Sequence, residues 1–285
     1  MAAMEPLTVE STTDRATALA EAGPFLRSRP VENNLVLSLL AQRQSSTDGR
    51  YWWACRGDEV MGFAFNSPLS FRTVLSPLGP ASAGTTDVVV ALVDAMVEHA
   101  PELAGVASDA ATAAAFAGRW AERRGVPAVP VEGQRIYRLG AVRHPSGVPG
   151  GLRPAAASDR DVLVAWATSF LGDTDSQGLD AADMTDRHLR AGRLWVWEHD
   201  GRPVSTAAAS VPAAGVSRVA FVYTPPEDRL HGYATACVAA LSARIVAGDA
   251  AICILYTQLS NPRSNAIYRR IGYEPVMEGL VYRFG

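Results

Sequence analysis

The chain carries two copies of one pattern, and this repeat limits the fold more than any other feature of the sequence. The segment GRYWWACRGDEVMGFAF, residues 49–65, matches GRLWVWEHDGRPVSTAA, residues 192–208, in its Gly-Arg start, aromatic strand and polar turn. Two hairpins of one kind are predicted. Further on, RWAERRGVPAV matches IYRRIGYEPV, and the offset drifts only from 143 to 147 residues. The sequence therefore predicts a duplicated unit.

A stretch rich in proline and glycine separates the two copies. It reads IYRLGAVRHPSGVPGGLRP and offers little apolar surface to bury. We predict domains at 1–140 and 153–285, joined by a linker at 141–152. Each is expected to be an α/β (α+β) domain with a mixed central sheet flanked by helices. The helix start of the first copy, ASAGTTDVVVALVDAMV, has no basic residue, so this copy is expected to keep its structure and lack chemistry.

Composition narrows the function classes. The formal charge of −3 gives no broad cationic field for nucleic acid or membrane lipid. The first residues, MAAMEPLTVESTTDRATALAEAG, lack the continuous apolar core of a signal peptide, and no run is long enough to span a bilayer. We interpret Cys55, Cys237 and Cys253 as reduced core residues of a cytoplasmic protein. The histidines show no metal-ligand spacing, so no metal is expected.

A strand–helix–strand unit dominates the second copy. SRVAFVY (217–223) and AAICILYT (250–257) are near-continuous apolar runs, which are typical of buried parallel strands. The helix between them ends at Gly248, and its apolar stripe is Ala234, Val238, Leu241 and Ile245. The loop before this helix lies at the carboxyl end of a strand, where open α/β sheets bind ligands.

That loop, RLHGYA (229–234), permits three interpretations: a plain strand-to-helix turn, a nucleotide phosphate loop, or an acyl-CoA pyrophosphate loop. Its backbone N–H groups lie at the positive end of a helix, and Gly232 and Ala234 leave room for an anion. Neither G-x-G-x-x-G after a strand nor G-x-x-x-x-G-K-[ST] is present. The nucleotide interpretations therefore lose their main support.

A second helix, within QLSNPRSNAIYRRIGYEPV, follows the next strand. Asn261 and Pro262 are a capping residue and a first-turn proline, and Gly272 is a stop signal. We expect one polar face of Asn261, Asn265 and Tyr268 opposite a buried face of Ile267 and Ile271. Two amides and a phenol beside an anion loop are interpreted as a ligand edge.

These motifs, in this order, resemble the GNAT superfamily of N-acetyltransferases across 151–285. Its acetyl-CoA loop, [RQ]-x-x-G-x-[GA], is matched by Arg229, Gly232 and Ala234. Leu230 and His231 stand where many members have Gly and Arg, which implies a stiffer, less basic loop. The resemblance implies acetyl-CoA as co-substrate, bound by Phe221, Val222, Tyr223, Arg229, Leu230, His231, Gly232, Tyr233, Ala234, Thr235, Asn261, Ser264, Asn265 and Tyr268. The arrangement also resembles tandem members with a degenerate first copy.

The resemblance implies direct attack of a primary amine on the thioester. A backbone N–H near Phe221 to Tyr223 would bind the thioester oxygen. Tyr268, with an ordinary pKa of about 10, is the expected proton donor to the leaving thiolate. Candidate bases are Glu198, Asp173, Asp175 and Glu278, of which Glu198 is the chosen catalytic residue.

The resemblance implies that the acceptor is a small-molecule or peptide amine. Acidic residues within 169–189 indicate either a cationic amine or a solvated surface. A non-catalytic acyl-CoA-binding regulator, and a tandem transferase for an aminoacyl or thiol-sugar amine, stay open as alternatives. A monomer or homodimer is expected.

Overall fold

The computed structural model describes residues 5–42, 48–99, 102–173 and 179–285. The chain forms two compact units. The first contains Met1–Arg135, Gln258–Ser260 and Val276–Gly285, and the second contains Ile136–Thr257 and Asn261–Pro275. No helix among the described residues is both long and apolar enough to cross a membrane.

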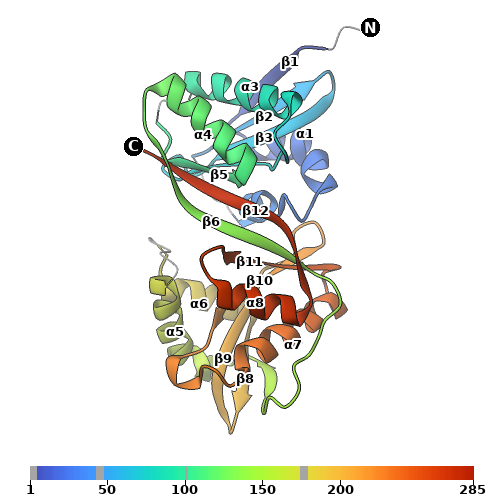
Figure 1. Ribbon diagram of the computed structural model, residues 1–285, viewed down its shortest axis with the longest axis vertical. Helices are drawn as coiled ribbons and strands as arrows, with labels where there is room; N and C mark the ends of the chain where they lie inside the picture. Colours follow the sequence, from blue (N-terminus) through green and yellow to red (C-terminus); the bar gives the residue numbers. More distant parts are fainter. Residues whose placement is uncertain (1–4, 43–47, 100–101, 174–178) are drawn as a thin grey trace. The chain divides into compact units, whose positions relative to one another are not determined.

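The first unit is a mixed sheet with helices (Figure 1). Its elements are β1 (Leu7–Thr12), α1 (Arg15–Ser28), α2 (Asn34–Gln42), β2 (Arg50–Arg56), β3 (Glu59–Asn66), β4 (Thr73–Leu75), α3 (Ala83–His99), β5 (Gly105–Asp109), α4 (Ala110–Arg124) and the start of β6 (Ala128–Leu139). The strand order is β1-β2-β3-β4-β5-β12, in which β4 and β5 are parallel.

The second unit repeats this order of elements: a strand, two helices, three strands, a helix, a strand, a helix and a strand. They are β7 (Gly151–Pro154), α5 (Arg160–Asp173), α6 (Ala181–Arg190), β8 (Leu194–His199), β9 (Arg202–Ala209), β10 (Val216–Tyr223), α7 (Tyr233–Ala247), β11 (Ile252–Gln258), α8 (Pro262–Ile271) and β12 (Tyr273–Phe284). Short 3-10 turns, Ala157–Asp159 and Pro226–Asp228, precede α5 and α7. The two matching hairpins, β2–β3 and β8–β9, are confirmed.

The sheet of the second unit, in the order β6-β11-β10-β9-β8-β7, has a core on each side. On the α7 face, Cys253 and Leu255 pack with Val219, Leu241 and residues of α8. On the α5 face, residues of α5 and α6 pack over β8, β9 and the carboxyl end of β10. The predicted parallel crossover is confirmed, because β10 and β11 pair in parallel around α7. Apolar runs without alternation arise because both faces are covered.

The final strand completes the sheet of the first unit. Gly279 to Arg283 of β12 pair antiparallel with Gly105 to Asp109 of β5, and Phe284 lies in the core of the first unit. Residues 276–285 therefore belong to the first compact unit, although they lie within the domain predicted at 153–285. The reason is physical: strand pairing between residues about 170 positions apart leaves no local pattern.

Candidate functional site

A fork between β10 and β11 lies at the centre of the candidate site. The two strands pair from Val216 with Ile252 to Val219 with Leu255. Just beyond, the register of β10 against β9 shifts between Ala220 and Tyr223, and Phe221 has φ +45°. A bulge of this kind re-aims side chains and ends strand pairing. It coincides with the backbone segment predicted to face a thioester.

The bulge is fixed from two sides. The Ser205 hydroxyl donates to the Tyr223 carbonyl at 3.1 Å. The Phe221 ring contacts Phe170 at 5.3 Å between centroids, and the Tyr223 ring contacts Trp166 at 6.1 Å, so both rings enter the core on the α5 face. Val222 is half-buried beside the opposite core. The strained backbone is therefore held by packing.

The loop before α7 contains two residues with positive φ, separated by His231. Leu230 has φ +70° although it is not glycine, and 88% of it is exposed. Gly232 caps α7 with φ +84°, and a Cβ there would lie 3.0 Å from a Val148 methyl carbon. Glycine is thus required at 232 by conformation and by space. A strained, exposed apolar residue is a feature that functional loops show more often than structural turns.

An ion pair that was not predicted from the sequence stabilises this loop. Arg202 donates two hydrogen bonds to Asp228, at 2.8 and 2.6 Å, from the start of β9. The pKa of the buried Asp228 carboxyl is lowered, first by hydrogen bonding from Arg202. The only signal in the sequence is an arginine and an aspartate 26 positions apart, which no spacing rule connects.

The first turn of α7 is open. Gly232 provides no side-chain cap, so the N–H groups of Tyr233, Ala234 and Thr235 have no acceptor within the helix. Arg229 donates to the Thr224 carbonyl at 3.0 Å, and the exposed His231 ring stacks on Tyr233 at 5.5 Å. The loop predicted from the sequence is therefore a helix start whose N–H groups are available to an anion.

The matching helix of the first unit is closed. At the start of α3, the Ser82 hydroxyl accepts from Thr85 N at 3.2 Å, and the Thr85 hydroxyl accepts from Ser82 N at 2.8 Å. Leu78 N donates to Asp109 Oδ2 and to Thr112 Oγ1, at 3.2 and 3.1 Å. These bonds tie the segment after β4 to the end of β5 and the start of α4. The helix start of the first copy thus has a side-chain cap, whereas that of the second copy has none.

Helix α8 begins and ends as predicted, but its faces differ from the prediction. Asn261 Oδ1 accepts from Ser264 N at 3.0 Å, and Gly272 ends the helix with φ +108°. Asn265 and Tyr268 share the buried side with Ile271, and only Asn261 of the expected polar face is exposed. The expected polar face is therefore wrong, because polar side chains that bond internally can lie on the side an apolar pattern assigns to solvent.

Asn265 makes internal hydrogen bonds with both ends of its amide. Its Oδ1 accepts from the Tyr137 hydroxyl at 2.9 Å, and its Nδ2 donates to the Asn261 carbonyl at 2.6 Å. The amide thus joins β6 to the first turn of α8. Its described bonds position this helix, and its predicted contact with a ligand stays a prediction.

Tyr268 lies among aromatic rings, at 6.5 Å from Tyr137 and 6.1 Å from Tyr273 between centroids. Burial raises the pKa of its phenol to about 12, against a smaller opposing effect of a hydrogen bond with Ser264. Side chains on a helix point toward its start, and the hydrogen bond with Ser264 agrees with a phenol directed to the first turn of α8. It stays protonated at neutral pH.

Residues 160–273, which contain the fork, the loop and α8, match the model of the Acetyltransferase (GNAT) family. They form a GNAT-family acetyltransferase domain. None of the curated proteins matches the chain.

Solved structures match the fold over nearly the whole chain. A GNAT-family acetyltransferase from Colwellia psychrerythraea has 10% identity and a TM-score of 0.62, covering 97% of this chain and 99% of its own. A GCN5-related N-acetyltransferase from Sphaerobacter thermophilus has 17% identity and a TM-score of 0.57, with 98% and 96% covered. A tandem GNAT protein from the clavulanic acid biosynthesis pathway has 11% identity and a TM-score of 0.56, with 96% and 98% covered. The mixed α/β fold is thereby confirmed.

The candidate bases are scattered. In the GNAT domain, Glu198 accepts from Arg153 Nε at 2.5 Å, and β9 separates its strand from β10. Asp173 is exposed at the end of α5. Glu278 belongs to the first unit, where it pairs with Arg135. Asp175 lies outside the described residues. The structure therefore brings none of the three described carboxylates to the fork.

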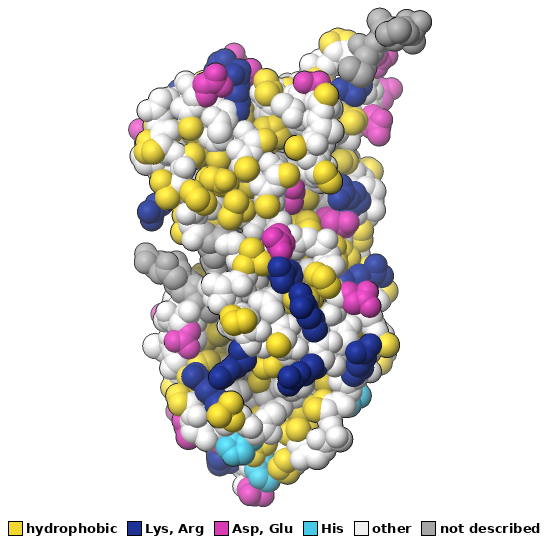
Figure 2. Space-filling model, in the orientation of Figure 1, with side chains coloured by type: hydrophobic (Ala, Val, Ile, Leu, Met, Phe, Trp, Pro, Cys, Tyr) yellow, Lys and Arg dark blue, Asp and Glu magenta, His cyan; other side chains and the backbone are white. Residues whose placement is uncertain are grey.

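Exposed arginines are concentrated on the α7 face of the GNAT domain. Figure 2 shows basic side chains gathered over α7 and α8, on the face seen in that view. Helix α8 contributes Arg263, Arg269 and Arg270, all exposed. This local positive charge, in a chain of net charge −3, favours anionic ligands on that face.

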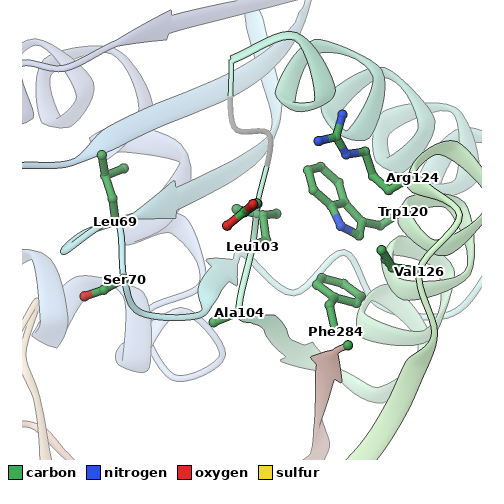
Figure 3. Close-up of a pocket in the computed structure, with 10 residues that line it drawn as sticks. Leu69, Ser70, Leu103, Ala104, Trp120, Arg124, Val126 and Phe284 are labelled. Atoms are coloured by element: carbon green, nitrogen blue, oxygen red, sulfur yellow. The ribbon is translucent and has the colours of Figure 1, made fainter.

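A hollow of about 680 Å³ lies in the first unit, where Trp120, Arg124 and Phe284 line it (Figure 3). None of the predicted site residues lines this hollow.

His188 of α6 makes the stability of the GNAT domain depend on pH. Burial, followed by the charges of Arg187 and Arg218, lowers its pKa from 6.5 to about 4. The unfolded chain therefore binds this proton first as the pH falls, and stability is lost below about pH 6.5. We expect wild type to lose roughly 1 to 2 kcal/mol more than His188→Gln between pH 7 and pH 5. Urea unfolding at both pH values checks this, and equal losses would contradict it.

Proposed function

We propose that the chain is an N-acetyltransferase that transfers the acetyl group of acetyl-CoA to a primary amine of a small molecule or peptide. The observation that carries the proposal is the contrast between two equivalent helix starts. The start of α7 is uncapped and follows a strained loop, whereas Ser82 and Thr85 cap α3. An uncapped start stabilises a pyrophosphate through its N–H groups and dipole. One acetyl-CoA site per chain follows, in the second unit.

Each residue then has a role in acyl transfer. Bound acetyl-CoA supplies an activated acyl group as a thioester. The backbone N–H groups at Phe221 to Tyr223 donate to the thioester oxygen as its negative charge grows. The protonated Tyr268 phenol donates to the leaving sulfur as the C–S bond breaks and the N–C bond forms. Asn265 holds α8, and thus Tyr268, in place through its bonds to Tyr137 and Asn261.

The attacking ammonium must first lose its proton. Glu198 is the proposed proton acceptor. Because β9 lies between its strand and β10, the proton would pass through intervening water. Three free, buried cysteines fit a reducing compartment, and we propose that the enzyme acts in the cytoplasm.

Calorimetric titration with acetyl-CoA tests the site, and thiol release with a panel of primary amines tests the reaction. We expect one equivalent bound per chain and release that depends on an amine. Binding without release for any amine would identify a regulatory acyl-CoA-binding protein instead. Two equivalents, or none, would contradict the contrast between α7 and α3.

A further inference from the structure

An arginine and a tyrosine lie on the α5 face of the sheet, beside the fork. Val219 and Leu255 pack into the core on the α7 face, so their strand neighbours Arg218 and Tyr256 point to the opposite face. The guanidinium carbon of Arg218 is 4.9 Å from the centroid of the Tyr256 ring. Both side chains are half-buried. Arg218 pairs in register with Ile254, one residue before β10–β11 pairing ends.

The charge of Arg218 is not matched by a carboxylate among the described residues. Stacking on Tyr256 occupies one face of the guanidinium and does not use the N–H groups in its plane, which can bind an anion. Two acidic residues of the neighbouring helix are engaged elsewhere: Asp186 accepts from Arg160 at 2.7 and 2.9 Å, and Asp180 caps α6 at 2.7 Å. Asp183, on the same helix, is exposed.

Further groups add to this positive surface. Arg138 of β6 alternates with Tyr137 and Leu139, which pack into the core on the α7 face, so Arg138 points to the same face as Tyr256 and is exposed. His188 of α6 is close enough to Arg218 for the arginine to lower its pKa. Its imidazole is therefore uncharged at neutral pH and offers a hydrogen bond. Arg138 and the neutral imidazole of His188 thus add a positive charge and a hydrogen-bonding group to this face, both of which suit an anion.

We propose that the acceptor amine carries an anionic group, a carboxylate or a phosphate, which Arg218 binds on the α5 face beside the fork. This inference rests on the proposed function, because it places the amine next to the thioester. Arg218 lies one residue from the end of pairing, a step of about 3.3 Å along a strand, so the anion and the amine belong to one small molecule. The proposal thus favours a zwitterionic amine over a cationic one, which was one of the two interpretations of the acidic residues within 169–189.

Paired acceptors test this inference. Amino acids are compared with their C-terminal amides, and phosphoethanolamine with ethanolamine, by kcat/KM for thiol release. Wild type should prefer the anionic member of at least one pair type, which identifies carboxylate or phosphate. Arg218→Gln should lower kcat/KM for that member by about 10- to 50-fold, the range expected for a charged hydrogen bond, and leave its neutral partner unchanged. Arg218→Lys should lie between the two. Arg244→Gln, an equal charge loss on α7, should change neither.

A binding measurement separates this inference from the proposed function. The melting temperature of the protein with coenzyme A is recorded with each amine, for wild type and Arg218→Gln. Raised values with anionic amines in wild type alone support the anion site even if no thiol is released. Acetyl-CoA binding and turnover with a preference for neutral amines would overturn the inference and leave the proposed function intact. Equal loss for both members of a pair in Arg218→Gln would also overturn it.

Discussion

Ala234→Asp is expected to abolish acetyl-CoA binding while the protein stays folded. Position 234 is the second residue of α7, where a carboxylate is favourable for the helix itself because it interacts with the dipole and the free N–H groups. The same carboxylate fills the place proposed for the pyrophosphate and repels it. Two unit charges about 5 Å apart near a protein surface repel by roughly 3 kcal/mol, which corresponds to about a 10²-fold loss of affinity.

Gly84→Asp is the matched control for this substitution. Gly84 is the second residue of α3, the equivalent helix of the first unit, and a Cβ there meets no atom within 4 Å. We expect this variant to bind acetyl-CoA as wild type does. Calorimetry and thermal unfolding of the three proteins provide the measurement. Unchanged affinity in Ala234→Asp would remove the α7 start from the site, and an equal loss in Gly84→Asp would place a second ligand site in the first unit.

Tyr268→Phe is expected to separate binding from turnover. The ring packs between Tyr137 and Tyr273, and phenylalanine keeps that packing. Because burial raises the pKa of the phenol to about 12, wild type carries the proton at neutral pH. Its loss should lower kcat by about 10²-fold, the lower end of what a positioned proton donor contributes, with acetyl-CoA affinity nearly unchanged.

Tyr273→Phe distinguishes a catalytic phenol from any buried phenol. The Tyr273 hydroxyl bonds with Ser242 at 2.7 Å inside the core, so its removal should lower stability by about 1 kcal/mol and leave kcat unchanged. Steady-state thiol release at saturating substrates, with unfolding curves, compares the variants. A kcat for Tyr268→Phe equal to that of wild type would exclude the phenol from the mechanism.

Local chemistry made much of the second unit predictable. The apolar strands predicted the crossover, and the proline after Asn261 and the stop at Gly272 predicted the bounds of α8. Each of these signals acts within a few residues of the chain. The prediction that Gly232 opens the helix is confirmed, whereas its φ of +84° and its closeness to Val148 become visible only in three dimensions.

The features that escaped prediction all depend on distant partners. The buried position of Asn265 depends on Tyr137, which lies 128 residues earlier in the chain. The Arg202–Asp228 pair and the ion pair of Glu198 with Arg153 likewise join separate strands and turns. A sequence pattern assigns polar side chains to solvent by default, and only the fold supplies the partner that reverses this.

The pairing of β12 with β5 has a consequence for how the protein is made on the ribosome. Gly279 to Arg283, the partners of β5, are synthesised after strands β7 to β11 of the second unit. Until then, the edge of β5 presents unpaired N–H and C=O groups, which are templates for aggregation. Domains usually fold in the order in which they emerge. Here the amino-terminal sheet is finished last, so its completion reports that the transferase domain has been fully translated.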